Sequence, residues 1–167
     1  MPYSASYWIE KLAMETHVEG GAYAEIYRSS LLQKKEYLPD AFNGDRSIAT
    51  AIYFLLQKGQ FSAFHRIASD EIWHFYAGDP IEIFEINTTG ELITHLLGSD
   101  PEMGHAFVRI IPAGSWFASR VIEGGVYGLA GCTVSPGFDF EDFELADAKK
   151  LAGEFPQHSF LINSLCR

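Results

Sequence analysis

The chain has 167 residues, 47% hydrophobic and 14% aromatic, which excludes a disordered or low-complexity polypeptide. Its formal charge of −10, with 12 scattered Lys and Arg residues, disfavours a nucleic-acid partner because phosphate binding draws on clustered basic side chains. The longest aliphatic and aromatic run, residues 51–56, is too short to cross a bilayer. We therefore expect one cytoplasmic domain over residues 1–167, with no membrane partner.

The N-terminal part predicts a helix, a turn, a strand and a loop. Residues 4–14 place apolar side chains at helical spacing. The sequence Glu19-Gly20-Gly21 predicts a turn, or alternatively a close approach of the backbone to a ligand with Glu19 as a polar contact. Residues 23–30 alternate as in a strand. The polar residues 33–46 predict a mobile loop, which either lies over a pocket mouth or is a solvated excursion.

The central part predicts strands joined by short connections. Residues 61–67 and 72–77 are rich in aromatic and β-branched side chains and flank a polar segment, so we expect a β-hairpin. A second hairpin is expected from residues 81–87 and 92–97. Further strands are predicted at residues 47–56, 106–111, 116–122 and 126–134. Eight or nine strands without interleaved helices indicate an all-β fold, a double-sheet jelly roll or related barrel.

The C-terminal part predicts a wrapping segment followed by helices. Residues 138–144 alternate phenylalanines with acids and are expected to wrap around the barrel. Residues 147–155 and 157–165 predict two short helices broken at Pro156. Short helices are thus expected to flank the strands at both ends of the chain.

Residues 59–78 carry the most informative spacing. Gly59, His65, Glu71 and Gly78 occupy four of the five fixed positions of G-x5-H-x-H-x3-E-x6-G, the first motif of the cupin superfamily, which this chain therefore resembles. The longer pattern HRxxSDExWHxYxG resembles an uncharacterised cupin family of bacteria and fungi. The resemblance implies a double-stranded β-helix (the cupin jelly-roll barrel) and a homodimer, and it carries no settled activity.

The resemblance also implies a metal site, but two of its ligands are replaced. Ile67 stands where the second histidine belongs, and Phe117 stands at the histidine position of the second cupin motif. Only His65 and Glu71 remain, whereas a tightly bound divalent transition metal generally needs three or four protein ligands. We therefore expect no cofactor. A metal-dependent cupin enzyme with a non-standard ligand set stays as an alternative.

Strand parity directs several side chains towards one interior, where they would form a pocket for a small molecule. The predicted interior set is His65, Glu71, Trp73, Phe75, Phe117 and Ser119. Further candidates for ligand contacts are Glu19, Arg28, Arg66, Ser69 and Asp70. Ser69 and Asp70 have the alternative role of closing the hairpin through bonds to the backbone. Cys132 is expected to be a buried small hydrophobic residue rather than a nucleophile.

A histidine beside a carboxylate suits general acid–base catalysis. By analogy with metal-free cupin epimerases of deoxysugar nucleotides, we expect His65 to act as the base, Glu71 to orient it, and Tyr53, or else Tyr76 or Tyr127, to act as the acid. The leading hypothesis is a cupin that binds a small polar metabolite and epimerises or isomerises a sugar or sugar nucleotide without metal. The alternative is a non-catalytic binding or sensing module that uses the same pocket.

Overall fold

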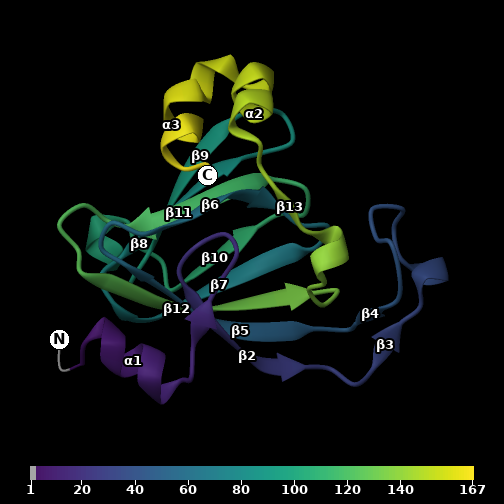
Figure 1. Cartoon of the computed structure of the whole chain (residues 1–167), viewed down its shortest axis with the longest axis horizontal. Coiled ribbons are helices and arrows are strands. Elements are labelled where there is room, and N and C mark those ends of the chain that lie inside the picture. The colour runs from purple at the N-terminus through teal and green to yellow at the C-terminus, as the bar shows by residue number, and fades with distance from the viewer. Residues whose placement is uncertain (1–2) are drawn as a thin grey trace.

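The computed structural model describes residues 3–167 and contains two antiparallel sheets packed face to face (Figure 1). The first sheet contains, in spatial order, β1 (Glu15–Thr16), β2 (Ala22–Arg28), β5 (Thr50–Gln57), β12 (Tyr127–Ser135), β7 (Asp70–Gly78) and β10 (Val108–Ile111). The second contains β13 (Glu144–Leu145), β6 (Phe61–Arg66), β11 (Trp116–Val121), β8 (Ile81–Ile86) and β9 (Leu92–Leu97). The prediction of an all-β jelly roll is confirmed.

Short helices flank the sheets, as predicted. Helix α1 (Ala5–Lys11) begins after Ser4, whose Oγ accepts a hydrogen bond from the backbone N–H of Tyr7. After the last strand come α2 (Ala148–Glu154) and α3 (Ser159–Ser164), separated by a turn that begins at Pro156. Within the described residues, none of the helices has the length and apolar character needed to cross a membrane.

The predicted hairpin of residues 61–77 is wrong. Strand β6 pairs with β11 and β13 in the second sheet, whereas β7 pairs with β12 and β10 in the first. The polar residues between β6 and β7 therefore carry the chain from one sheet to the other. A short polar connection suits such a corner as well as it suits a hairpin, so composition alone does not distinguish them. The predicted β8–β9 hairpin is confirmed, with Ile81 opposite Leu97 and Ile86 opposite Leu92.

Three apolar clusters hold the layers together. The cluster between the sheets contains large side chains from both, including Phe54, Trp73, Ile83 and Phe117. A second cluster joins the outer face of the second sheet to α2 and α3, around Phe64, Trp116, Leu151 and Ile162. A third joins one end of the first sheet to α1, around Leu55, Tyr127 and Leu129. Burial of this apolar surface is the main favourable contribution to folding.

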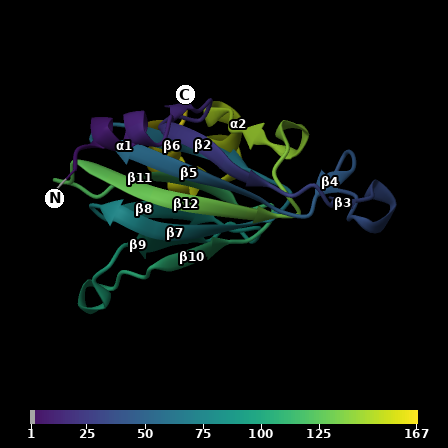
Figure 2. The same ribbon diagram turned by 90° about the horizontal axis from the view of Figure 1, so that it is seen from below.

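Two further segments shape the region beside the first sheet. Residues 32–47, here called the arm, extend away from the sheets (Figure 2) and contain the paired strands β3 (Leu32–Gln33) and β4 (Arg46–Ser47). The ends of the predicted loop are thus ordered as a two-stranded sheet. Residues 136–143, here called the strap, lead from β12 to the edge strand β13, which pairs with β6.

The two outer glycines of the 59–78 motif are predicted to differ in their tolerance of substitution. Both have positive φ angles, +78° at Gly59 and +95° at Gly78. An added Cβ at Gly59 would meet open space, whereas at Gly78 it would collide with the carbonyl oxygen and ring of Tyr127. We expect Gly59→Ala to lower the free energy of unfolding by about 1 kcal/mol and Gly78→Ala by about 2–4 kcal/mol. If urea denaturation showed that the two variants lose the same free energy of unfolding, the predicted difference between Gly59 and Gly78 would be contradicted.

Candidate functional site

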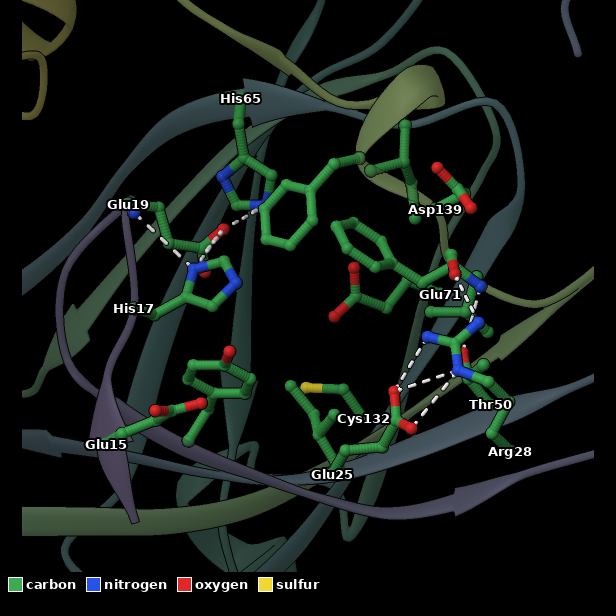
Figure 3. Close-up of a pocket in the computed structure, with 16 residues that line it drawn as sticks. Glu15, His17, Glu19, Glu25, Arg28, Thr50, His65, Glu71, Cys132 and Asp139 are labelled. Atoms are coloured by element: carbon green, nitrogen blue, oxygen red, sulfur yellow. Dashed lines mark hydrogen bonds and ion pairs between the residues drawn. The ribbon is translucent and has the colours of Figure 1, made fainter. Parts of the chain in front are cut away.

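A cavity of about 260 Å³ lies between the first sheet, strand β6 and the strap, and sixteen residues line it (Figure 3). Its inner end is formed by buried side chains of mixed chemistry: His17, Glu19, His65, Ile67, Glu71 and Cys132. Its outer rim is polar and aromatic: Glu15, Tyr23, Glu25, Arg28, Asp139 and Phe140. The cavity therefore combines a buried set of titratable groups with an accessible charged mouth.

His65 and Glu19 share one proton at the inner end. The Nδ1 atom of His65 lies 2.7 Å from the carbonyl oxygen of Ala63, and because a carbonyl only accepts, Nδ1 carries a hydrogen. The Nε2 atom lies 3.2 Å from Oε2 of Glu19. A bare nitrogen would repel a bare carboxylate oxygen at this distance, so the contact is favourable when one of the two atoms carries a proton. Both ring nitrogens of His65 are thus occupied by the protein.

The surroundings of Glu19 favour a proton on its carboxyl group. Ser62 donates a hydrogen bond to Oε1 at 2.8 Å, which leaves Oε2 to carry the proton. The Nδ1 atom of His17 accepts the backbone N–H of Glu19 and also lies 3.4 Å from Oε2. Burial raises the pKa of Glu19 to about 7, against the opposing effects of His17 and Ser62. Burial also lowers the pKa values of both histidines, so the neutral imidazoles accompany a protonated Glu19.

Of the two buried acids that line the cavity, Glu71 has fewer hydrogen-bonding partners than Glu19. Its side chain is 8% exposed, and its partner is the thiol of Cys132, a weak donor. Burial raises the pKa of Glu71 to about 7, the charge of His65 opposes this shift, and the charge of Glu19 adds to it. Burial also raises the pKa of Cys132, so the thiol stays protonated beside the carboxyl. Glu71 can therefore gain or lose a proton near neutral pH while facing the cavity.

The strap covers this cluster with aromatic rings. Phe140 stacks on His17 with ring centroids 6.1 Å apart, and Phe143 stacks on His65 at 5.4 Å. The buried Arg46 of the arm holds the strap, since its guanidinium donates to Asp142 at 2.7 Å and to Glu141 at 3.2 Å. Residues 33–46 were predicted either to lie over a pocket mouth or to be a solvated excursion, and Arg46 at the end of this segment holds the strap beside the cavity.

The predicted tyrosines do not reach the cavity. Tyr53 packs on the outer face of the first sheet, where its ring meets Tyr76 at 5.9 Å. Tyr76 is half exposed, and the hydroxyl of Tyr127 donates to the carbonyl of Tyr3. The assignment of Tyr53 as an acid is therefore corrected, because its side chain points away from the cavity. Among the lining residues, Tyr23 of β2 is the tyrosine.

Three more predicted contacts lie elsewhere. Arg66 pairs with Glu144 at 2.7 Å and stacks over Trp116, on the outer side of the second sheet. Ser69 donates to the carbonyl of Pro136, and Asp70 accepts the backbone N–H of Ala113. These bonds to the backbone fix the chain at the corner between the sheets, so the alternative role of Ser69 and Asp70 is structural as expected but does not close a hairpin.

The remaining predicted residues divide between core and cavity. Trp73, Phe117 and Ser119 point inward as parity predicts, but they are packed in the interior beyond the cavity, and Phe75 is only partly buried against that core. The ring of Phe117 lies 4.1 Å from that of His65 and closes this side. His65, Glu71, Glu19 and Arg28 do line the cavity. The carboxylate in contact with His65 is Glu19, which corrects the orienting role expected of Glu71.

Several lining residues were not predicted from the sequence. No role was predicted for His17, and Tyr23 and Glu25 were predicted only as part of an alternating strand. Alternation in β2 did place Tyr23 and Glu25 on one face, which was the available signal. Cys132 is buried, as expected, and it also borders the cavity beside Glu71. Phe138 and Phe140 of the strap line the cavity because the strap folds back across the first sheet.

The side chains at the inner end do not suit a metal ion. Across residues 3–167, no group of three or more His, Cys, Asp or Glu side chains is arranged to hold one. Ile67 presents carbon to the cavity, and Phe117 packs against His65 where another ligand would be needed. Both nitrogens of His65 already have protein partners. The donor set therefore does not fit a tightly bound transition metal.

Comparison with known proteins gives matches over nearly the whole chain. Residues 6–146 match the family described as Cupin superfamily (DUF985). A hypothetical protein from Leishmania major is 32% identical, with a TM-score of 0.90 over 98% of this chain and 99% of its own. A protein from Shewanella oneidensis is 39% identical, with a TM-score of 0.88 over 99% of this chain and 98% of its own.

A more distant structure shares the fold alone. Oxalate decarboxylase from Bacillus subtilis is 14% identical, with a TM-score of 0.54 over 90% of this chain and 36% of its own. No curated protein matches the sequence significantly. The similarity thus extends to complete chains in two relatives and to part of a chain in the decarboxylase.

The raised pKa of Glu71 predicts how a neutral replacement alters stability with pH. Its pKa is 4.5 in the unfolded chain and about 7 in the folded protein, so folding binds this proton and stability falls as the pH rises through that range. Gln does not titrate, so the stability of the Glu71→Gln variant does not fall through this pH range on account of residue 71. We expect the variant to match the wild type near pH 4.5 and to exceed its free energy of unfolding by about 1–3 kcal/mol at pH 8. If urea denaturation gave the same difference in free energy of unfolding between the two proteins at every pH, the raised pKa of Glu71 would be contradicted.

Proposed function

Because this chain belongs to the cupin superfamily, in the family described as DUF985, we propose that it is a metal-independent enzyme that moves a proton on a small polar metabolite. The observation that carries the proposal is the pairing of two proton-exchanging groups at the inner end of the cavity. One is Glu71, and the other is the proton shared by Glu19 and His65. A general acid or base works best when its pKa lies near the working pH.

The two groups have complementary roles in the proposed reaction. Glu71 removes a proton from the carbon next to a carbonyl group, because its carboxylate faces the cavity without a strong donor. The Glu19–His65 pair supplies a proton to the resulting enolate. No electrons are gained or lost, and the proton taken up by Glu71 balances the one released by the pair. Such a reaction isomerises or epimerises its substrate.

The walls of the cavity support a sugar as substrate. The rings of Tyr23, Phe138 and Phe140 line it and offer flat surfaces for the apolar face of a sugar ring. Polar groups at both ends can orient hydroxyl groups. A non-catalytic binding module is the second candidate, and it is favoured by one observation: both ring nitrogens of His65 are satisfied within the protein.

Solvent exchange tests the proposed chemistry. Thermal-shift screening of aldoses, ketoses and amino sugars identifies binders, and NMR in deuterated water follows exchange at the carbon next to the carbonyl. We expect wild-type exchange to fall by about 100-fold or more in Glu71→Gln, with binding retained. The exposed residue Glu123 provides the control variant Glu123→Gln, which should exchange normally.

Three results would contradict parts of this proposal. Undiminished exchange in Glu71→Gln removes Glu71 as the base. If the wild type binds a sugar but catalyses no deuterium exchange, the enzymatic proposal fails and the non-catalytic binding module is the function that stands. One equivalent of iron, manganese, nickel or zinc in protein purified without chelators contradicts the metal-independent mechanism.

We also propose a homodimer formed through the outer face of the first sheet. Helix α1 covers one end of this face, whereas α2 and α3 cover the corresponding face of the second sheet. The uncovered part carries exposed apolar side chains, with Tyr76, Val108 and Ile110 each about half exposed. Strand β10 also forms the outer edge of the sheet. Exposed apolar patches of this kind commonly mark interfaces, and a two-fold axis would bury two copies together.

A charge placed on this face should separate the subunits. We expect Ile110→Glu to convert a dimer to a monomer in light scattering, because two carboxylates would be buried at the interface. Phe160 on α3 is 89% exposed and lies away from this face, so Phe160→Glu serves as the control and should remain dimeric. A monomeric wild type at micromolar concentration would contradict the interface.

A further inference from the structure

The charges around the cavity mouth are predominantly negative. Glu15, Glu25 and Asp139 line the rim, and Arg28 is the only Lys or Arg among the lining residues. Three carboxylates against one guanidinium leave a negative field at the entrance. Such a field raises the local concentration of cations and repels anions.

The guanidinium of Arg28 is already engaged. Its Nε and Nη2 atoms donate to the carboxylate of Glu25, with the shortest contact at 2.7 Å, and Nη1 donates to the carbonyl of Phe138 at 3.0 Å (Figure 3). Two of its five N–H donors stay free, but Glu25 already offsets the charge of Arg28, so an incoming phosphate or carboxylate would meet little net positive charge there. Arg28 is one of the candidate ligand contacts, and its pairing with Glu25 argues against a role in binding anions.

Among the described lining residues, the inner end contributes no Lys or Arg that would compensate an anion. His17 and His65 are buried, and burial lowers their pKa values, which disfavours the cationic forms. The buried Glu71 faces the cavity with only the Cys132 thiol as a partner, so a carboxylate is available to accept hydrogen bonds from a ligand. An ammonium group supplies three donors for such an acceptor.

Aromatic rings complete a cation-binding environment. Tyr23, Phe138 and Phe140 line the same cavity as the acidic rim residues and Glu71. The faces of aromatic rings attract cations, most strongly where water is excluded. Carboxylates and ring faces around one cavity thus favour a positively charged ligand over a neutral one, and a neutral ligand over an anionic one.

We infer that the metabolite bound in this cavity is a small polyhydroxy amine, protonated near neutral pH, of the amino-sugar class. The inference rests on the proposed function, since it assumes that the cavity takes a small polar metabolite. It disfavours sugar nucleotides, whose diphosphate would meet three carboxylates and one guanidinium that is already paired with Glu25. The ammonium group pairs with carboxylates, and the ring packs against the aromatic wall.

Three sugars of similar size separate charge from shape. Glucosamine, glucose and glucuronate are titrated into the wild-type protein by calorimetry near neutral pH and at low salt. We expect glucosamine to bind at least about tenfold more tightly than glucose, and glucuronate to bind more weakly than glucose. The preference for glucosamine should shrink as salt is added, because the rim charges are accessible.

Two rim variants test the source of the preference. Glu25→Gln frees Arg28, so the ratio of glucosamine to glucuronate affinity should fall at least about tenfold, mainly through a gain by glucuronate. Asp139→Asn removes a carboxylate without freeing Arg28. It should therefore weaken the binding of glucosamine, and it should strengthen the binding of glucuronate less than Glu25→Gln does. Unchanged melting temperatures verify that both variants are folded.

The outcomes distinguish this inference from the proposed function. Equal or tighter binding of glucuronate than glucosamine overturns the charge assignment but leaves a polar-metabolite site in place. Unchanged selectivity in both rim variants also overturns it, because the rim then does not select the ligand. Failure of all three sugars to bind at about 10 mM overturns both the inference and the sugar-binding function.

Discussion

The arrangement of the inner cavity depends on one proton held between His65 and Glu19. Without it, two buried acceptors would face each other at 3.2 Å, and the carboxylate would remain charged in a site that strongly disfavours charge. The same contact joins two distant segments, because the backbone carbonyl of Glu19 also accepts the N–H of Ala63 in β6. These two contacts therefore fix the tautomer of His65, and they also fix the position of the glycine turn against β6 at the inner wall of the cavity.

Different elements carry the chemical and the selective parts of the site. The groups able to exchange protons lie on β6, β7 and the turn after β1, and they are buried. The charged groups that a ligand meets first lie on β1, β2 and the strap, where they are accessible. Selectivity at the rim can thus change through surface substitutions that leave the shared proton undisturbed. This separation is common where a rigid barrel presents variable edges.

Much of the fold follows from local patterns, and much of the site does not. Alternation, helical spacing and proline positions predicted the strands and terminal helices, because these signals act within a few residues. The error at residues 61–77 arose because strand pairing depends on which sheet each strand joins. Parity correctly sent Trp73 and Phe117 inward but could not show that they fill the interior. Tyr53 was misplaced and Tyr23 missed for a related reason: the cavity wall comes from segments whose proximity exists only in the folded chain.

The ion pair between Arg46 and Asp142 makes the arm and the strap one cooperative unit of local unfolding. Arg46 is 3% exposed, so separating it from Asp142 while the strap stays folded would leave a buried charge without its partner. The two segments therefore open together, as a unit less stable than the sheets that support them. Opening this unit would lift Phe140 and Phe143 from the two histidines and admit water to the inner cavity.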